Sequence, residues 1–162
     1  MLTPISLVSR LVSSGIAKPN EIIGCSDQDI LLIQNKSGLQ LPQAYIDFLI
    51  AIGRNAGSFM SDIDFLFPKV LGLNEAAADI LNDWEEGKLV LPEKAFVFSM
   101  RYGEQFMFFI ADEDSDDPPV YFYFEKDGKF KKTGESIWRV IDSSLEMEER
   151  IHRENPDSPL FN

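Results

Sequence analysis

Three short runs of aromatic and β-branched residues constrain the fold of this chain most. They are Phe96–Phe98, Phe106–Ile110 and Val120–Phe124. Such residues favour β-strands, where their bulk packs well on a pleated surface. Gly103 lies between the first two runs, and Asp127-Gly128 is a strong hairpin signal after the third. Because strands this close in sequence pair antiparallel, we expect a meander sheet.

A helix with a marked start and stop is predicted over Leu41–Gly57. Pro42 suits the first helical position, because its missing N–H has no partner there. Gly53 and Gly57 supply the stop and the turn. The apolar stripe at helical spacing consists of Leu41, Tyr45, Phe48, Leu49 and Ile52. This stripe predicts a helix that packs in the core.

Four other segments also have helical patterns. The first is residues 5–14, and the second starts at the capping pair Ser26 and Asp29, with Ile30, Leu31 and Ile33 on its apolar stripe. The third is capped by Asn74, includes Trp84 and ends at Gly87. The fourth is residues 136–153, with an apolar stripe of Ile137, Val140, Ile141, Leu145 and Ile151. Around Pro68 the pattern indicates an extended segment at a sheet edge.

The order of these elements predicts an α+β fold: a single domain with an antiparallel meander sheet, packed by N-terminal helices and a C-terminal helix. We expect this domain to span residues 1–162, with its core at about 22–153 and a tail at 154–162. Pro156 and Pro159 place that tail outside regular structure.

The charge balance argues against nucleic acid and membrane as direct partners. The chain carries 15 Lys and Arg against 27 Asp and Glu, a formal net charge of −12. Phosphate contacts need Lys and Arg, and an anionic lipid surface would repel such a protein. A basic protein would be attracted, although acidity can also serve solubility alone. No apolar run approaches the ~20 residues that cross a bilayer, and no signal peptide is recognisable, so we expect a cytoplasmic protein.

Catalytic and metal chemistry is limited by the residue counts. The chain has one histidine, His152, and one cysteine, Cys25. These counts exclude a histidine-based triad, a two-histidine or cysteine zinc site and an intramolecular disulfide. Cys25 is better interpreted as a partly buried structural thiol. No glycine-rich phosphate loop is present, and many carboxylates occur without a spacing that singles out a catalytic pair. We therefore expect no catalytic residue, no cofactor and no metal site.

The acidic segment Asp112–Asp117 has three interpretations. Asp112, Asp114 and Asp116 alternate as in an EF-hand calcium loop. Asp117 stands where an EF-hand has its turn glycine, and Tyr123 stands where it has its bidentate glutamate, so an EF-hand is excluded. A weak cation site remains as the first interpretation. The other interpretations are a solvated loop and a docking patch for a basic partner. The patch would consist of Asp112, Glu113, Asp114, Asp116 and Asp117.

Two tyrosines in the third strand run are further candidates for partner binding. Tyr121 and Tyr123 share one face of the strand, opposite Val120, Phe122 and Phe124. Tyrosine is enriched at protein interfaces because it combines apolar area with a polar tip. Met107 and Phe109 would join this face if their strand pairs alongside. The alternative, which we favour somewhat, is that a helix covers the tyrosines.

The ordered combination of these motifs resembles the SUKH superfamily, which includes fungal cell-wall assembly regulators and many bacterial immunity proteins. The matching motifs are Leu41-Pro42, Tyr45, Phe48-Leu49, Gly53, Phe96–Phe98, Tyr102-Gly103, Phe106–Ile110, Pro119-Val120-Tyr121 and Ser136-Ile137-Trp138. The resemblance covers roughly Ile22 to Leu145, and Ile137 departs from the usual phenylalanine. Most of these positions are core and turn positions, so they support the fold better than the function.

The resemblance implies a protein-binding domain without catalytic activity. It favours a bacterial immunity protein that binds and neutralises a cognate toxin, often a nuclease, of a polymorphic or contact-dependent toxin system. A nuclease is typically basic, which suits the acidity of this chain. The alternatives are a regulatory or scaffold domain in cell-wall or stress control and, last, a metal-dependent enzyme that uses acidic residues.

Overall fold

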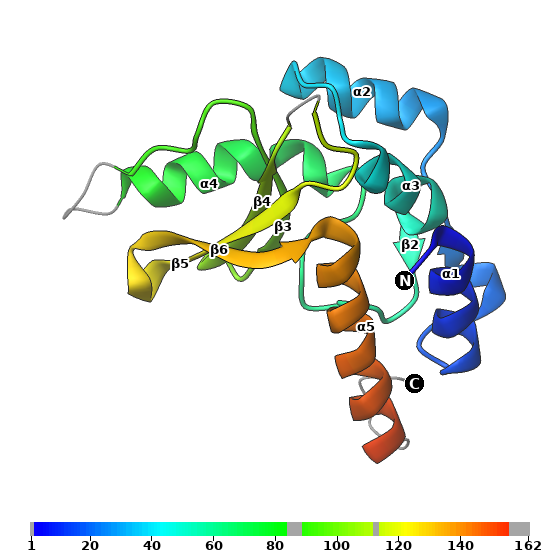
Figure 1. Cartoon of the computed structure of the whole chain (residues 1–162). Helices are drawn as coiled ribbons and strands as arrows, with labels where there is room; N and C mark the ends of the chain where they lie inside the picture. The colour runs from blue at the N-terminus through cyan, green and yellow to red at the C-terminus, as the bar shows by residue number, and fades with distance from the viewer. Residues whose placement is uncertain (1, 84–88, 112–113, 156–162) are drawn as a thin grey trace.

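A four-stranded antiparallel sheet forms the centre of the fold (Figure 1). Its strands are β3 (Ala95–Arg101), β4 (Gln105–Ile110), β5 (Pro119–Phe124) and β6 (Lys129–Ser136), and they lie side by side in chain order. The chain is seen in a computed structural model that describes residues 2–83, 89–111 and 114–155. The predicted meander and the α+β class are both confirmed.

Helices surround this sheet unevenly. They are α1 (Pro4–Ser13), α2 (Asp27–Ser37), α3 (Gln43–Ile52), α4 (Leu73–Asn82) and α5 (Ile137–Glu154), with short 3-10 turns η1 (Pro19–Glu21), η2 (Lys69–Gly72) and η3 (Glu125–Asp127). Figure 1 shows α1, α2 and α3 gathered at one end of the molecule, while α5 leaves β6 and runs away from the sheet. A small sheet pairs β1 (Ile22–Ile23) with β2 (Asn55–Ala56), which the sequence did not indicate.

The α3 helix packs its apolar stripe into the core. All five residues of its predicted stripe are buried, and Tyr45 packs 5.3–6.0 Å from the rings of Phe96, Phe98 and Phe109. Pro42 is the N-cap of α3 and not its first helical residue. Aromatic burial of this kind is the main source of stabilisation in a chain without disulfides.

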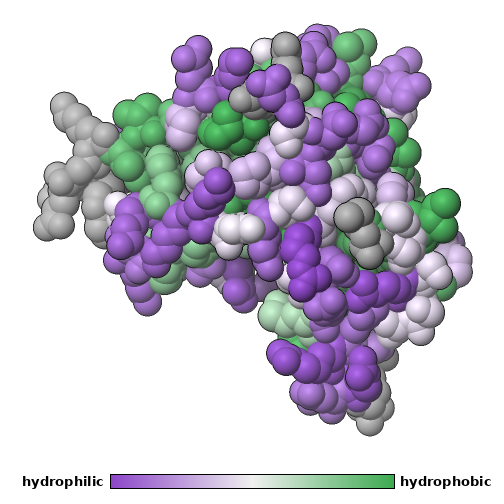
Figure 2. Space-filling model, viewed as in Figure 1, coloured by the Kyte–Doolittle hydropathy of each residue, from purple (hydrophilic) through white to green (hydrophobic). Residues whose placement is uncertain are grey.

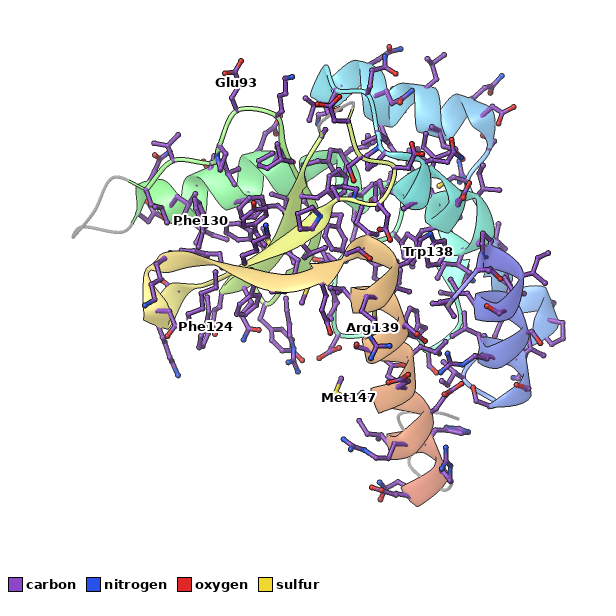
Figure 3. The ribbon with its side chains drawn as sticks, viewed as in Figure 1. Glu93, Phe124, Phe130, Trp138, Arg139 and Met147 are labelled. Carbon is purple, nitrogen blue, oxygen red and sulfur yellow. The ribbon has the colours of Figure 1, made fainter. Side chains whose placement is uncertain are left out.

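A second aromatic cluster lies on the opposite face of the sheet. It consists of Phe106, Phe108, Tyr121, Tyr123 and Phe130. The register pairs Phe106 with Tyr123 and Phe108 with Tyr121, which places these residues on one face. The prediction that Met107 and Phe109 join the tyrosines is therefore wrong. Figure 3 shows the two faces at the β5–β6 hairpin, where Phe130 and Phe124 extend to opposite sides.

Asn74 does not cap α4, as the sequence suggested. The N-cap is Gly72, and the Asn74 side chain instead pairs with the edge of β3. Its Nδ2 donates to the Ala95 carbonyl and its Oδ1 accepts from the Val97 N–H, both at 2.8 Å. The same side-chain amide can bond either to the start of its own helix or to unpaired backbone groups of a strand edge, and here it bonds to the strand. The predicted positions Trp84 and Gly87 lie outside the described residues.

Three smaller expectations also differ from the structure. Around Pro68 the chain forms the η2 turn, and a single bridge, between Asp64 and Met100, pairs this segment with a strand among the described residues. Leu31 and Ile151, which the spacing placed on apolar stripes, are exposed. Leu31 lies off the face shared by Ile30 and Ile33, and Ile151 lies in the last turns of α5, which run away from the sheet (Figure 1).

A tight junction joins α2, α3 and β1. Gly24 lies against α3 so closely that a Cβ atom would come within 1.7 Å of the Ile50 carbonyl oxygen, and Cys25 N–H donates to the Leu49 carbonyl at 2.8 Å. Gly53 is also needed for close packing, since its Cβ would be 2.6 Å from the Leu49 oxygen and from Cys25 Sγ. Burial raises the pKa of the Cys25 thiol to about 11, as expected of a structural cysteine.

The junction is closed by an ion pair. Asp29 accepts two hydrogen bonds from the Arg54 guanidinium, each 2.7 Å, and one from the Ser26 N–H at 2.9 Å. The predicted Ser26–Asp29 capping box at the start of α2 is thus confirmed. Arg54 also lies over the Phe67 ring, 4.8 Å from its centroid. Among the described helices, none has the length and apolar character that a bilayer crossing requires.

Candidate protein-binding site

The acidic segment supports two helix starts. The Asp116 carbonyl accepts the Ala44 N–H at 2.8 Å in the first turn of α3, and Asp117 Oδ1 accepts the Trp138 N–H at 3.2 Å in the first turn of α5. Negative charge is favourable at such a helix end. The Asp114 and Asp116 side chains are exposed and that of Asp117 is half-buried. Of the described part of this segment, Asp114 and Asp116 therefore offer the most side-chain surface to a partner.

Asp112 and Glu113, the remaining members of the predicted patch, lie outside the described residues. Within residues 2–83, 89–111 and 114–155, no group of three or more His, Cys, Asp or Glu side chains could hold a metal ion.

The two tyrosines of β5 differ in accessibility. Tyr123 is only 1% exposed and stacks on Phe106, with 4.8 Å between ring centroids. Tyr121 is half-buried and stacks on Phe108 at 5.2 Å. The sheet geometry therefore makes Tyr123 part of the core, and of the two tyrosines Tyr121 alone has side-chain surface available for a partner.

A pocket that none of these residues lines was not anticipated. It has a volume of about 350 Å³ and lies between α5, the segment 58–63 and the turn that joins β3 to β4. We call it the α5 pocket. Three large exposed side chains line it: Tyr102 at 73%, Met147 at 50% and Ile151 at 37% exposure. Figure 3 shows Met147 extending sideways from α5 into the space below the sheet. Apolar side chains gathered in this way are typical of interaction sites.

The β3–β4 turn projects Tyr102 toward solvent. Tyr102 and Gly103 have φ angles of +54° and +69°, as a type I′ hairpin requires, and the Glu104 N–H donates to the Arg101 carbonyl at 3.1 Å. Arg101 is ion-paired with Asp62 across the pocket wall, at 2.6 Å, and its guanidinium lies 5.3 Å from the Tyr102 ring centroid. The aromatic ring is therefore presented beside a charged pair.

Glu148 is the most unusual polar residue of the α5 pocket. Its Oε1 accepts the Met60 N–H at 2.7 Å, whereas its Oε2 is buried and has no hydrogen-bond partner among the described residues. Burial is the main cause that raises the pKa of this carboxyl to about 7; the Met60 hydrogen bond opposes the rise, and the charge of Asp62 adds to it. Met60 itself has a φ of +50°, uncommon for a residue with a side chain. The fold thus holds a poorly compensated carboxylate beside an open pocket.

The α5 wall of the pocket is braced by α1. Arg10 donates from Nη1 to Asp142 at 2.7 Å, and from Nε and Nη2 to Glu149 at 2.9 and 2.7 Å. These two carboxylates raise the pKa of Arg10, so its charge is permanent. Gly15, just after α1, lies so close to His152 that a Cβ would be 3.0 Å from Nε2. The α5 segment that carries Met147, Glu148 and Ile151 is therefore fixed in position.

Residues 24–146 match the model of the SMI1/KNR4 family (SUKH-1). The chain belongs to this family. The resemblance to the SUKH superfamily drawn from the sequence motifs is confirmed by this match. No curated protein and no solved structure matches the chain.

The family match covers the sheet and α2, α3 and α4 but not all of the α5 pocket. Met147, Glu148 and Ile151 follow the last matched residue, and Arg10 precedes the first. Part of this wall and of its brace therefore lies outside the matched residues, whereas Ser144 of the wall and Asp142 of the brace lie within them.

One signal in the sequence could have drawn attention to Glu148. It follows Ile141 by seven residues and Leu145 by three, which places it on the buried stripe of α5. A charged residue on such a stripe is informative because burial of an unpaired charge is costly. Tyr102 and segment 58–63 gave no comparable signal, because their approach to α5 depends on the fold.

Proposed function

We propose that this SUKH-1 protein is a non-catalytic binding domain that neutralises a basic toxin domain, as an immunity protein does. The observation that carries this proposal is the family match over residues 24–146. Membership in the family is consistent with an immunity or protein-interaction domain, and the resemblance implies bacterial relatives that inhibit toxins.

The charge of the protein supports a basic partner. The formal net charge is −12. Figure 2 shows hydrophilic side chains over α5 and along β6, and those of β6 include the basic residues Lys129, Lys131 and Lys132, so a basic partner would be attracted by the net charge and not by the β6 edge. Opposite charge raises the rate of encounter between two proteins, and the effect weakens as salt increases. A nuclease toxin needs a basic groove to hold phosphate, so an acidic inhibitor could occupy that groove.

The test uses the purified protein and the toxin domain encoded in the neighbouring reading frame. Calorimetry at 50 and 300 mM salt should give 1:1 binding that is tighter at low salt, and equimolar protein should abolish toxin activity. If the protein binds without inhibiting, a scaffold role replaces neutralisation. Absence of binding at both salt concentrations would rule out this toxin as the partner and contradict the proposal.

A pair of variants tests the acidic segment within this proposal. Asp114→Asn with Asp116→Asn removes two charges from the exposed part of that segment. Asp79→Asn with Asp83→Asn removes two exposed charges from α4 and from the residue that follows it. The first variant should slow association about threefold or more at low salt, while the second should have little effect. Equal slowing would assign steering to net charge and not to the acidic segment.

A further inference from the structure

We propose that the α5 pocket receives an arginine side chain of the protein partner, which pairs with Glu148 and lies against Tyr102 and Met147. The inference rests on the proposed function because it assumes a protein partner. It goes beyond that function by naming the pocket, the residue type that enters it and the group that recognises this residue.

The charge arrangement of the pocket favours a cation. Glu148 and Asp62 both line it, and Arg101, the basic residue among its lining residues, is already paired with Asp62 at 2.6 Å. Glu148 has one hydrogen bond, from Met60, and one oxygen without a partner among the described residues. Because this oxygen is buried, an entering guanidinium would supply donors for it once the Glu148 side chain rotates toward the pocket. A carboxylate with two acceptor oxygens matches the planar fork of arginine.

The apolar part of the pocket favours a long side chain with a flat end. Arg101 already lies over one face of the Tyr102 ring, and the rest of this 73% exposed ring remains for an entering guanidinium to contact. Met147 and Ile151 present exposed apolar surface for an aliphatic stem. The volume of about 350 Å³ lies at the low end of the range for ligand pockets. Aromatic and arginine anchors in such pockets dominate the affinity of many interfaces.

The cost of Glu148 to the fold supports a role in binding. A buried carboxylate that lacks a second partner destabilises a protein, and the pKa near 7 reflects this cost. Such groups cluster at sites of function, where a ligand supplies the missing interaction. Glu148 lies two residues after the end of the SUKH-1 match, whereas Met60, Asp62 and Tyr102 of the same pocket lie within it.

The first experiment needs no toxin. Nα-acetyl-arginine amide is titrated into the full-length protein at pH 8 and followed by NMR at the Met60 amide and the Met147 methyl group. We expect saturable shifts with a dissociation constant in the millimolar range. The neutral isostere Nα-acetyl-citrulline amide should give at least tenfold weaker binding. Equal shifts with both compounds would overturn the proposal.

Two variants locate the binding group. Glu148→Gln should weaken the arginine compound about tenfold or more, because it removes the charge and keeps the shape. Glu146→Gln is the matched control: it lies on the same helix, is exposed and does not line the pocket. An equal loss in both variants would contradict the proposal. Shifts of the same signals on raising protein concentration alone would also contradict it, since they would show a second copy of the chain in the pocket.

Failure of this inference can be told apart from failure of the proposed function. If the wild-type protein binds the neighbouring toxin and Glu148→Gln binds it equally well, the pocket assignment is wrong and the immunity function stands. If the toxin does not bind at all, the NMR titration still decides whether the pocket accepts arginine.

Discussion

Two carboxylates of this protein, Asp29 and Glu148, differ in how well their negative charge is compensated by hydrogen bonds. Asp29, 7% exposed, accepts two hydrogen bonds from Arg54 and one from Ser26, and these partners hold its pKa well below its usual range. Glu148 accepts one hydrogen bond from the described part of the chain, and burial raises its pKa to about 7. The carboxylate of Asp29 is therefore satisfied by its hydrogen-bond partners, whereas that of Glu148 has an oxygen that a ligand could still hydrogen-bond.

The largest loss of stability is expected when a side chain is added at the junction of α2, α3 and β1, where there is no room for it. In Gly24→Ala the new Cβ would come within 1.7 Å of the Ile50 carbonyl oxygen, which belongs to the backbone of α3 and cannot move aside cheaply. We expect a loss of about 3 kcal/mol or more in the free energy of unfolding, measured by urea denaturation.

Gly72→Ala is the control, because its Cβ would meet nothing within 4 Å and its φ is not positive. It should change stability by less than about 1 kcal/mol. Equal losses in the two variants would mean that the junction is less rigid than described.

Removing the charge of Asp29 should produce the next largest loss. Asp29→Asn weakens the bidentate pair with Arg54 and the capping box, so we expect a clear fall in melting temperature at pH 7. Asp27→Asn, an exposed residue in the same helical turn, is the control and should fall much less. Since the pKa of Asp29 is lowered by folding, the stability it contributes is present at neutral pH and is lost in acid. The gap between wild type and Asp29→Asn should therefore close as the pH falls below about 4.

Glu148→Gln should increase the stability of the fold at high pH, whereas Asp29→Asn decreases stability at pH 7. Folding raises the pKa of Glu148 from 4.5 to about 7, so the folded state binds more protons than the unfolded state between these values. Wild-type stability should therefore fall as the pH rises from 4.5 through 7 on account of this group. At pH 8 the Gln variant should be more stable than wild type by about 1–2 kcal/mol, after allowance for solvent screening.

At pH 4 that advantage of Glu148→Gln should vanish, because the wild-type carboxyl is then protonated in both states. Denaturation curves at several pH values measure this difference. A destabilised Gln variant at pH 8 would mean that Glu148 is satisfied and would remove the contrast with Asp29.

The smallest effect on stability is expected for an exposed charge in weak surface ion pairs. Arg139 is exposed and approaches Glu135, Asp142 and Glu146 at 3.9, 3.3 and 3.8 Å. Such surface pairs contribute little, so Arg139→Ala should change the free energy of unfolding by less than about 0.5 kcal/mol. Thermal denaturation at low and high salt measures it. A larger loss would show that ion pairs along α5 matter even without burial.

The sequence predicted what local periodicity decides. The aromatic runs predicted the meander, the α3 stripe predicted the core, and Ser26 with Asp29 predicted the start of α2. Where a residue had two competing uses, the prediction failed, as for Asn74, which bonds to a strand and does not cap its helix.

The candidate site was harder to predict. The predicted acidic patch, Asp112, Glu113, Asp114, Asp116 and Asp117, came from composition. The candidates Tyr121 and Tyr123 came from strand alternation, and the structure buries Tyr123 against Phe106, its partner in the sheet register. The α5 pocket brings together residues 60, 102 and 148, which are far apart in the chain. Such proximity follows from tertiary packing, which spacing within one segment does not encode.

The pairing of Asn74 with β3 also decides how the sheet can grow. The Asn74 amide occupies the outward hydrogen-bonding groups of Ala95 and Val97, and Asp64 occupies those of Met100, so no further strand can add along these positions. Beyond β6 no strand follows among the described residues, and Lys129, Lys131 and Lys132 are exposed on that strand. Lysine at an edge discourages self-association of strands. Addition of a strand to the four-stranded sheet is thereby confined to its β6 edge, where the lysines disfavour it.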